Sequence, residues 1–133
     1  MLGEESMTKQ KIKEIIEQTL TKEGCNLAVL FGSFLERDEF RDIDVLIAME
    51  DWRPPTLDEQ LYLAKLLEKR TGYLFNMVGI DSLGILIRAE ILKNGLPIIV
   101  ADADKWQEFC FRAWIDEMDF RLLMERFHKE LNE

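Results

Sequence analysis

Two apolar segments, Leu27-Ala-Val-Leu-Phe-Gly-Ser33 and Asp42-Ile-Asp-Val-Leu-Ile-Ala-Met49, decide the fold of this chain. Each contains a short continuous apolar run, which is typical of a strand buried on both faces. About a dozen residues connect the two runs, which is too short for an ordinary parallel crossover. We therefore expect antiparallel strands over 25–31 and 43–49, with residues 34–41 forming a charged loop or a single helical turn.

Helical periodicity surrounds this pair of strands. Apolar residues recur at helical spacing, which predicts helices over 7–22, 56–70, 82–94 and about 104–130. Thr56 followed by Glu59 is the pattern of a capping box. The other end signals are Ser82 and Asp104 as N-caps and Gly24, Gly72 and Gly95 as helix ends.

Shorter apolar runs predict two more strands, over 73–78 and 96–100, and Pro97 indicates that the second lies at a sheet edge. Together these elements predict an α/β or α+β fold. The chain of 133 residues is the size of one domain, so we expect a single domain over 1–133.

Composition excludes several classes of protein. A net charge of −9 and a pI of about 4.7 argue against direct binding of nucleic acid, which requires a basic surface. No apolar run approaches the roughly 20 residues of a membrane span, so we expect a cytoplasmic protein without a membrane partner. Cys25 and Cys110 belong to no metal-binding pattern, and we expect both to be reduced and apolar in role.

The most informative polar residues are Asp42 and Asp44. Side chains alternate along a strand, so both carboxylates lie on one face while Ile43 points to the other. Neighbouring carboxylates repel each other unless a cation neutralises them. Mg²⁺ or Mn²⁺ is the expected ion, because Mg²⁺ is commonly shared between carboxylates and substrate phosphates. An isolated Asp-x-Asp would otherwise be read as a surface strand end.

Gly32 and Ser33 follow the first strand and favour a phosphate-binding role. Glycine allows a phosphate to approach the backbone closely, and the Ser33 hydroxyl can donate a hydrogen bond. Arg37 and Arg41, in the charged loop, can each offset phosphate charge. The combination predicts metal-assisted nucleotidyl transfer from a nucleoside triphosphate.

This pattern resembles the minimal nucleotidyltransferases of the DNA polymerase beta superfamily. Their Gly-Ser and Asp-x-Asp motifs lie on the first two strands of a mixed sheet. The similarity extends over roughly residues 10 to 130 and is greatest to the antitoxins of HEPN-domain toxins. It implies a mixed four-stranded sheet flanked by helices, with a long C-terminal helix. Downstream the resemblance rests on Val78-Gly-Ile-Asp81-Ser-Leu, Ile87-Arg-Ala-Glu-Ile91 and Asn94-Gly-Leu-Pro-Ile-Ile.

The resemblance implies that Gly32 and Ser33 bind phosphate, and that Asp42 and Asp44 are catalytic and bind the metal. Two features depart from the family pattern. Eight residues rather than ten separate Ser33 from Asp42, which leaves open which arginine faces the nucleotide. Asn76 stands where the family has a third catalytic carboxylate, although it could also be a satisfied polar residue in a turn. Asp81 could replace that carboxylate only if its loop folds back.

The implied activity is transfer of AMP from ATP to a hydroxyl of a HEPN-type toxin. The alternative is a catalytically degenerate antitoxin that neutralises its partner by contact alone. A third reading, a small-molecule nucleotidyltransferase, requires a substrate domain for which this chain has no room. Self-association is a further expectation that the sequence leaves open.

The C-terminal helix is rich in aromatic residues, which fall on two sides. One stripe is expected to pack toward the sheet, and it comprises Phe109, Ala113, Phe120, Leu123, Met124 and Phe127. Phe111, Trp114 and Met118 fall on another side, where either the N-terminal helix covers them or a partner chain docks. Asp116, Glu117 and Asp119 beside them favour a basic partner.

Overall fold

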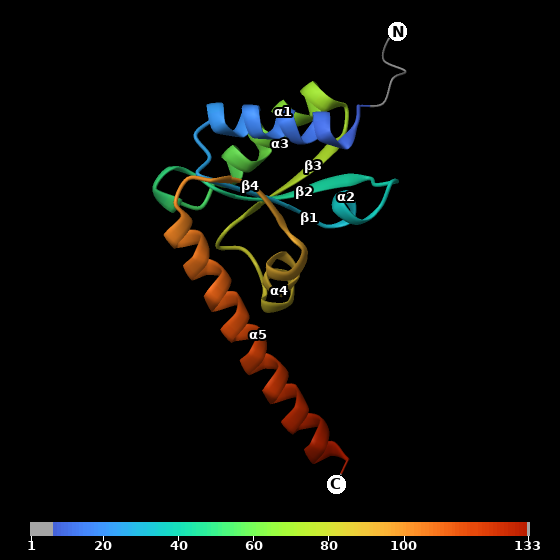
Figure 1. Cartoon of the computed structure of the whole chain (residues 1–133), viewed down its shortest axis with the longest axis vertical. Helices are drawn as coiled ribbons and strands as arrows, with labels where there is room; N and C mark the ends of the chain where they lie inside the picture. Colours follow the sequence, from blue (N-terminus) through green and yellow to red (C-terminus); the bar gives the residue numbers. More distant parts are fainter. Residues whose placement is uncertain (1–6, 133) are drawn as a thin grey trace.

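The computed structural model describes residues 7–132 and contains a mixed four-stranded sheet of order β3-β2-β1-β4 (Figure 1). The strands are β1 (Leu27–Phe31), β2 (Asp42–Ala48), β3 (Leu74–Gly79) and β4 (Leu96–Val100). Strand β1 pairs antiparallel with β2 and β4, whereas β2 pairs parallel with β3. The predicted antiparallel pair and the edge position of the Pro97 strand are therefore confirmed.

Helices cover both faces of this sheet (Figure 1). Helices α1 (Lys9–Lys22) and α3 (Leu57–Thr71) lie on one face, and α4 (Ile85–Asn94) and the start of α5 (Ala103–Leu131) lie on the other. The short helix α2 (Ser33–Glu36) and the 3₁₀ turn η1 (Glu50–Trp52) flank β2 in the chain. The first face includes Ile12, Ile16, Ala28, Leu30, Ile43, Val45 and Leu63, and the second Leu27, Val29, Leu46, Ala48 and Ile91.

Burial explains why the two central strands have continuous apolar sequences. All five residues of β1 are buried, since helices pack on both of its faces and strands pair along both of its edges. In β2 the residues from Val45 to Ala48 are also buried, but Asp42 is exposed and Asp44 is half-buried. The buried strand therefore becomes polar at its N-terminal end, where the layer that includes α4 and α5 no longer covers it.

The helix caps and helix ends predicted from the sequence are correct in part. Thr56 and Glu59 form the predicted capping box, and Gly72 ends α3 in the left-handed conformation. Helix α4 begins after Gly84 rather than after Ser82, whose hydroxyl instead donates to Asp81. Asp102, not Asp104, caps α5 by accepting from the Lys105 amide, so Asp104 lies within the first turn.

Helix α5 differs most from expectation, because its C-terminal half projects away from the sheet (Figure 1). Ala113 is buried and Phe109 and Phe120 are half-buried, but Leu123, Met124 and Phe127 are exposed rather than packed. Helix α1 lies on the opposite face of the sheet, so it does not cover Phe111, Trp114 and Met118 on the other side of α5. No helix within residues 7–132 has both the length and the apolar character that crossing a membrane requires.

Candidate functional site

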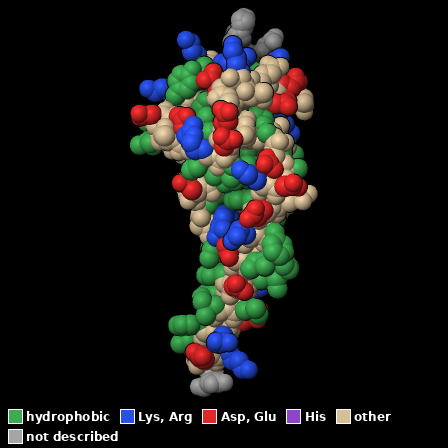
Figure 2. Space-filling view, turned by 90° about the vertical axis from the view of Figure 1, so that its left-hand side faces the viewer, with side chains coloured by type: hydrophobic (Ala, Val, Ile, Leu, Met, Phe, Trp, Pro, Cys, Tyr) green, Lys and Arg blue, Asp and Glu red, His purple; other side chains and the backbone are tan. Residues whose placement is uncertain are grey.

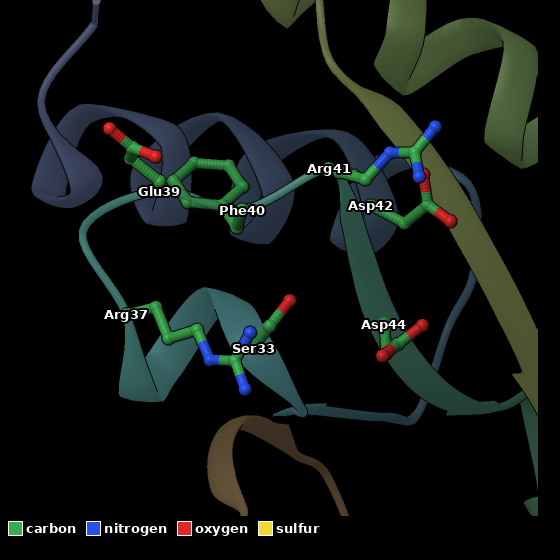
Figure 3. Close-up of a pocket in the computed structure, with 7 residues that line it drawn as sticks. All are labelled: Ser33, Arg37, Glu39, Phe40, Arg41, Asp42 and Asp44. Carbon is green, nitrogen blue, oxygen red and sulfur yellow. The ribbon is translucent and has the colours of Figure 1, made fainter.

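A cavity of about 510 Å³ opens at the N-terminal end of β2 (Figure 3). It lies between the loop after β1 and the start of β2. Five of the residues singled out in the sequence line this cavity, and Glu39 and Phe40 complete its wall. The five are Ser33, Arg37, Arg41, Asp42 and Asp44. The structure thus brings together both predicted motifs and both arginines.

Asp44 lies at the centre of this arrangement because three backbone segments meet there. Strand pairing places Asp44 opposite Phe31 on β1 and opposite Asn76 on β3. The Asn76 side-chain amide donates to Asp44 Oδ1 over 3.2 Å. Asn76 therefore lies within β3, directly beside Asp44, rather than in a turn.

The two carboxylates are electrostatically costly in the ligand-free protein. Burial raises the pKa of Asp44 above its usual value, and the negative charge of Asp42 raises it further. The hydrogen bond from Asn76 acts in the opposite direction on this pKa but does not cancel the rise. A cation at this position would remove the repulsion.

Gly32 provides the close approach that the site requires. Its φ of +82° lies in the region that favours glycine, and a Cβ built there would collide with the Asp44 carboxylate. Any larger residue would therefore push the loop away from the carboxylates. This contact joins the Gly-Ser turn to the Asp-x-Asp strand.

Lys9 is a part of the site that sequence reasoning missed. Its ammonium group donates to the carbonyl oxygens of Phe34 and Arg37, and it lies 5.2 Å and 5.5 Å from the ring centroids of Phe34 and Phe40. A side chain on α1 thus holds the short helix that carries Ser33. No local signal could reveal this contact, because Lys9 precedes Phe34 by 25 residues.

Two other positions refine the predicted site. Leu74 is paired with Asp42 across the β2–β3 ladder and is 60% exposed, which places an apolar side chain beside the carboxylates. Asp81 lines a separate cavity with Trp52 and Phe109, so its loop does not fold back to Asp42 and Asp44. Among the described residues, no group of three or more acidic, histidine or cysteine side chains is arranged to hold a metal.

The cysteines have no part in this cavity. Both are free, Cys25 is buried and Cys110 is partly buried. Burial, assisted by the charges of Glu59 and Glu23, raises the pKa of the Cys25 thiol to about 12. A thiol that stays protonated at neutral pH is a poor nucleophile.

Comparison with known proteins identifies the class to which this fold and cavity belong. Residues 10–104 match the polymerase beta nucleotidyltransferase family, so the chain belongs to that family. No curated protein sequence matches this chain.

Several solved structures have a similar fold. A chain in the complex of a tri-AMPylated Shewanella oneidensis HEPN toxin with MNT antitoxin superimposes with a TM-score of 0.71 at 15% identity, covering 95% of this chain and 100% of that chain. A toxin–antitoxin structure with AMP-PNP gives 0.69 at 16% identity, covering 96% and 100%. A proposed minimal nucleotidyltransferase gives 0.54 at 26% identity, covering 68% and 96%.

The burial of the Asp44 carboxylate, with a smaller contribution from the charge of Asp42, predicts that Asp44→Asn stabilises the ligand-free protein. Folding raises the pKa of this carboxyl group, so its ionised form is less stable in the folded protein than in the unfolded chain. Ionisation at neutral pH therefore destabilises the fold. We expect the variant to melt about 1–3 °C higher at pH 7. The gain should disappear below pH 3.8, the group's ordinary pKa, where the wild-type carboxyl is also protonated. Thermal melts across this pH range test it, with Asp38→Asn in the exposed loop as the control. A lower melting temperature at pH 7 would show that the carboxylate stabilises the fold.

The contacts of Lys9 predict that Lys9→Met loosens the loop while leaving the fold intact. Methionine retains the apolar stem over the two rings but removes both hydrogen bonds. Amide hydrogen exchange over residues 34–38 should become about tenfold faster, since local opening costs less. Lys9→Arg should restore much of the protection, and Lys11→Met on the exposed side of α1 should have no effect. An unchanged rate of amide hydrogen exchange in Lys9→Met would show that α1 does not hold this loop.

Proposed function

We propose that this chain transfers AMP from ATP to a hydroxyl group of a HEPN-type toxin and acts as the antitoxin of that toxin. The observation that carries the proposal is the contact of the Gly32 turn with the Asp44 carboxylate, in a cavity that also contains Ser33 and two arginines. Membership of the nucleotidyltransferase family supports the reaction type. The similar folds in an AMPylated toxin complex and in a complex with AMP-PNP support the substrate and the partner.

Asp42 and Asp44 fit a divalent cation, because they offer carboxylate oxygens from one strand face and Asp44 is destabilised when ionised alone. Mg²⁺ or Mn²⁺ at this position would neutralise triphosphate charge and make the α-phosphorus more electrophilic. The Asn76 side chain holds Asp44 through Oδ1, which leaves the other oxygen free to face the cavity.

The proposed reaction is an in-line displacement at the α-phosphorus of ATP. A toxin hydroxyl oxygen bonds to that phosphorus, the bond to the bridging oxygen of the β-phosphate breaks, and pyrophosphate leaves with the electron pair. Ser33 and the backbone at Gly32 hold the terminal phosphates close to the carboxylates. Arg37 and Arg41 line the same cavity and offset the charge of the departing pyrophosphate. Cytoplasmic ATP is the nucleotide source in this proposal.

Asn76 sets the rate of the proposed reaction, because its neutral amide does not accept a proton from the attacking hydroxyl. That proton passes to water instead. Loss of a positioned base typically costs about 10²- to 10⁴-fold in rate. The same residue favours the second candidate function, in which the chain neutralises its toxin by contact and does not transfer AMP.

Incubation with ATP radiolabelled at the α-phosphate, Mg²⁺ and a HEPN-type toxin distinguishes the two functions. Label transferred from the α-phosphate to the toxin, with release of pyrophosphate, is expected for the wild type. Asp42→Asn combined with Asp44→Asn should abolish both the transfer and the thermal stabilisation by Mg²⁺ and ATP. Toxin inhibition without any label on the toxin would establish contact-only neutralisation.

Asn76→Asp is expected to increase AMP transfer, since it introduces a carboxylate beside Asp44 that can accept the proton of the attacking hydroxyl. The gain should be at least about tenfold in the initial rate, within the range that general-base catalysis provides. Asn76→Ser is the control, because it removes the amide without adding a base. A folded aspartate variant that is stabilised by Mg²⁺ and ATP but transfers no faster would show that this position does not limit the reaction.

A further inference from the structure

The end of α5 carries an apolar surface that nothing in the described chain covers. Every described residue from Arg121 to Asn132 is exposed. Five of them have large apolar side chains, each between 43% and 74% exposed: Leu122, Leu123, Met124, Phe127 and Leu131. Figure 2 shows hydrophobic side chains along the projecting helix. Uncovered apolar surface of this kind marks an interaction site.

The apolar residues of α5 form two stripes on opposite sides of the helix, at about 100° per residue. We call one the inner stripe, because it begins on the sheet and continues past the body of the protein. The inner stripe is Phe109, Ala113, Phe120, Met124, Phe127 and Leu131. The outer stripe faces the opposite way and is Phe111, Trp114, Ile115, Met118 and Leu122. A helix with two opposite apolar stripes needs cover on both sides.

The body of the protein covers only the start of the inner stripe. Trp106 and Phe109 pack together against the sheet, with ring centroids 5.5 Å apart. Arg88 and Lys93 on α4 then pair with Asp116 and Glu117 on α5, at 3.0 Å and 3.1 Å. These two acids, which the sequence suggested for a partner, are therefore already paired within the chain.

We propose that α5 lies in an apolar groove of the toxin, which covers the projecting end of the inner stripe and the outer stripe at once. The proposal rests on the proposed function for the identity of the partner. A single flat contact would leave one stripe in water, whereas a groove removes both from it. Aromatic residues and methionine in the two stripes match the composition of interface cores.

Charge favours a basic partner over a second copy of this chain. Each copy carries a net charge of −9, so two copies repel each other as they approach. A basic toxin is attracted by the same charge. Asp119, Arg126 and Glu130 lie on one side of α5 between the two stripes and form no ion pair with any residue from 7 to 132. They are available to the rim of the proposed interface.

Most of α5 also has a counterpart in the fold of the chains solved in toxin–antitoxin complexes. The match to one such chain covers 96% of this sequence. The 29 residues of α5 make up more than a fifth of the sequence, so most of them must lie within the match. The projecting helix is therefore part of the shared fold rather than an addition to it. A helix that the fold retains, although the body does not cover it, is consistent with a docking role.

Calorimetric titration of the full chain with its HEPN-type toxin tests the proposal. The variants are Phe127→Glu in the inner stripe and Trp114→Glu in the outer stripe. His128→Glu is the matched control, because it adds the same charge to the same helix in the gap between the two stripes. Both stripe variants should raise the dissociation constant at least about tenfold, since loss of an aromatic anchor typically weakens binding by that factor or more. Their melting temperatures should stay near the wild-type value, because Phe127 and Trp114 are 56% and 47% exposed.

Three outcomes overturn the proposal. Wild-type affinity in either stripe variant shows that at least one stripe stays uncovered. A wild-type dimer that either stripe variant dissociates into monomers, measured by light scattering, assigns the surface to a second copy. A wild-type chain that fails to bind the toxin refutes the docking, and it refutes the proposed partner as well. AMP transfer by the wild type alongside undiminished binding of both variants leaves the proposed function standing and removes only the docking surface.

Discussion

The contact between the Gly32 turn and the Asp44 carboxylate organises the rest of the structure. It exists because β1 and β2 are antiparallel neighbours and Phe31, the last residue of β1, is paired with Asp44. The chain leaves β1 at the point where β2 changes from apolar to acidic. Only glycine permits the backbone to turn that close to a carboxylate. Burial of β1 and β2 between helical layers fixes the register that makes this contact.

The site has a cost in stability that its position in the fold limits. Two carboxylates on one strand face, one of them half-buried, disfavour the ligand-free state. The sheet tolerates them because they lie at the end of β2, where helical cover stops and water reaches Asp42. Asn76 reduces the cost further with a neutral donor, where a third carboxylate would add to the repulsion. An amide at this position therefore lowers the cost of keeping Asp44 ionised in the ligand-free protein.

Sequence patterns predicted the sheet and the candidate site but not the parts that depend on distant contacts. Continuous apolar runs identified β1 and β2, and the interval between them implied their antiparallel pairing. Strand alternation was sufficient to place Asp42 and Asp44 on one face, whereas the position of Asn76 beside them was expected from the family resemblance alone. The anchor formed by Lys9 was not predictable, because its partners are backbone carbonyls far along the chain. The exposure of Phe127 was missed for a similar reason, since periodicity defines a stripe but not what covers it.

The length of α5 has a consequence for the geometry of any complex that this chain forms. An α-helix rises about 1.5 Å per residue, so the 12 residues from Arg121 to Asn132 extend roughly 18 Å beyond the body. A stiff arm of fixed length holds whatever binds its tip at a set distance and angle from the cavity at β2. In the proposed complex the helix would therefore act as a ruler. Only an acceptor hydroxyl at the matching distance along the bound surface would reach the cavity, so acceptors would be selected without a pocket for the acceptor residue.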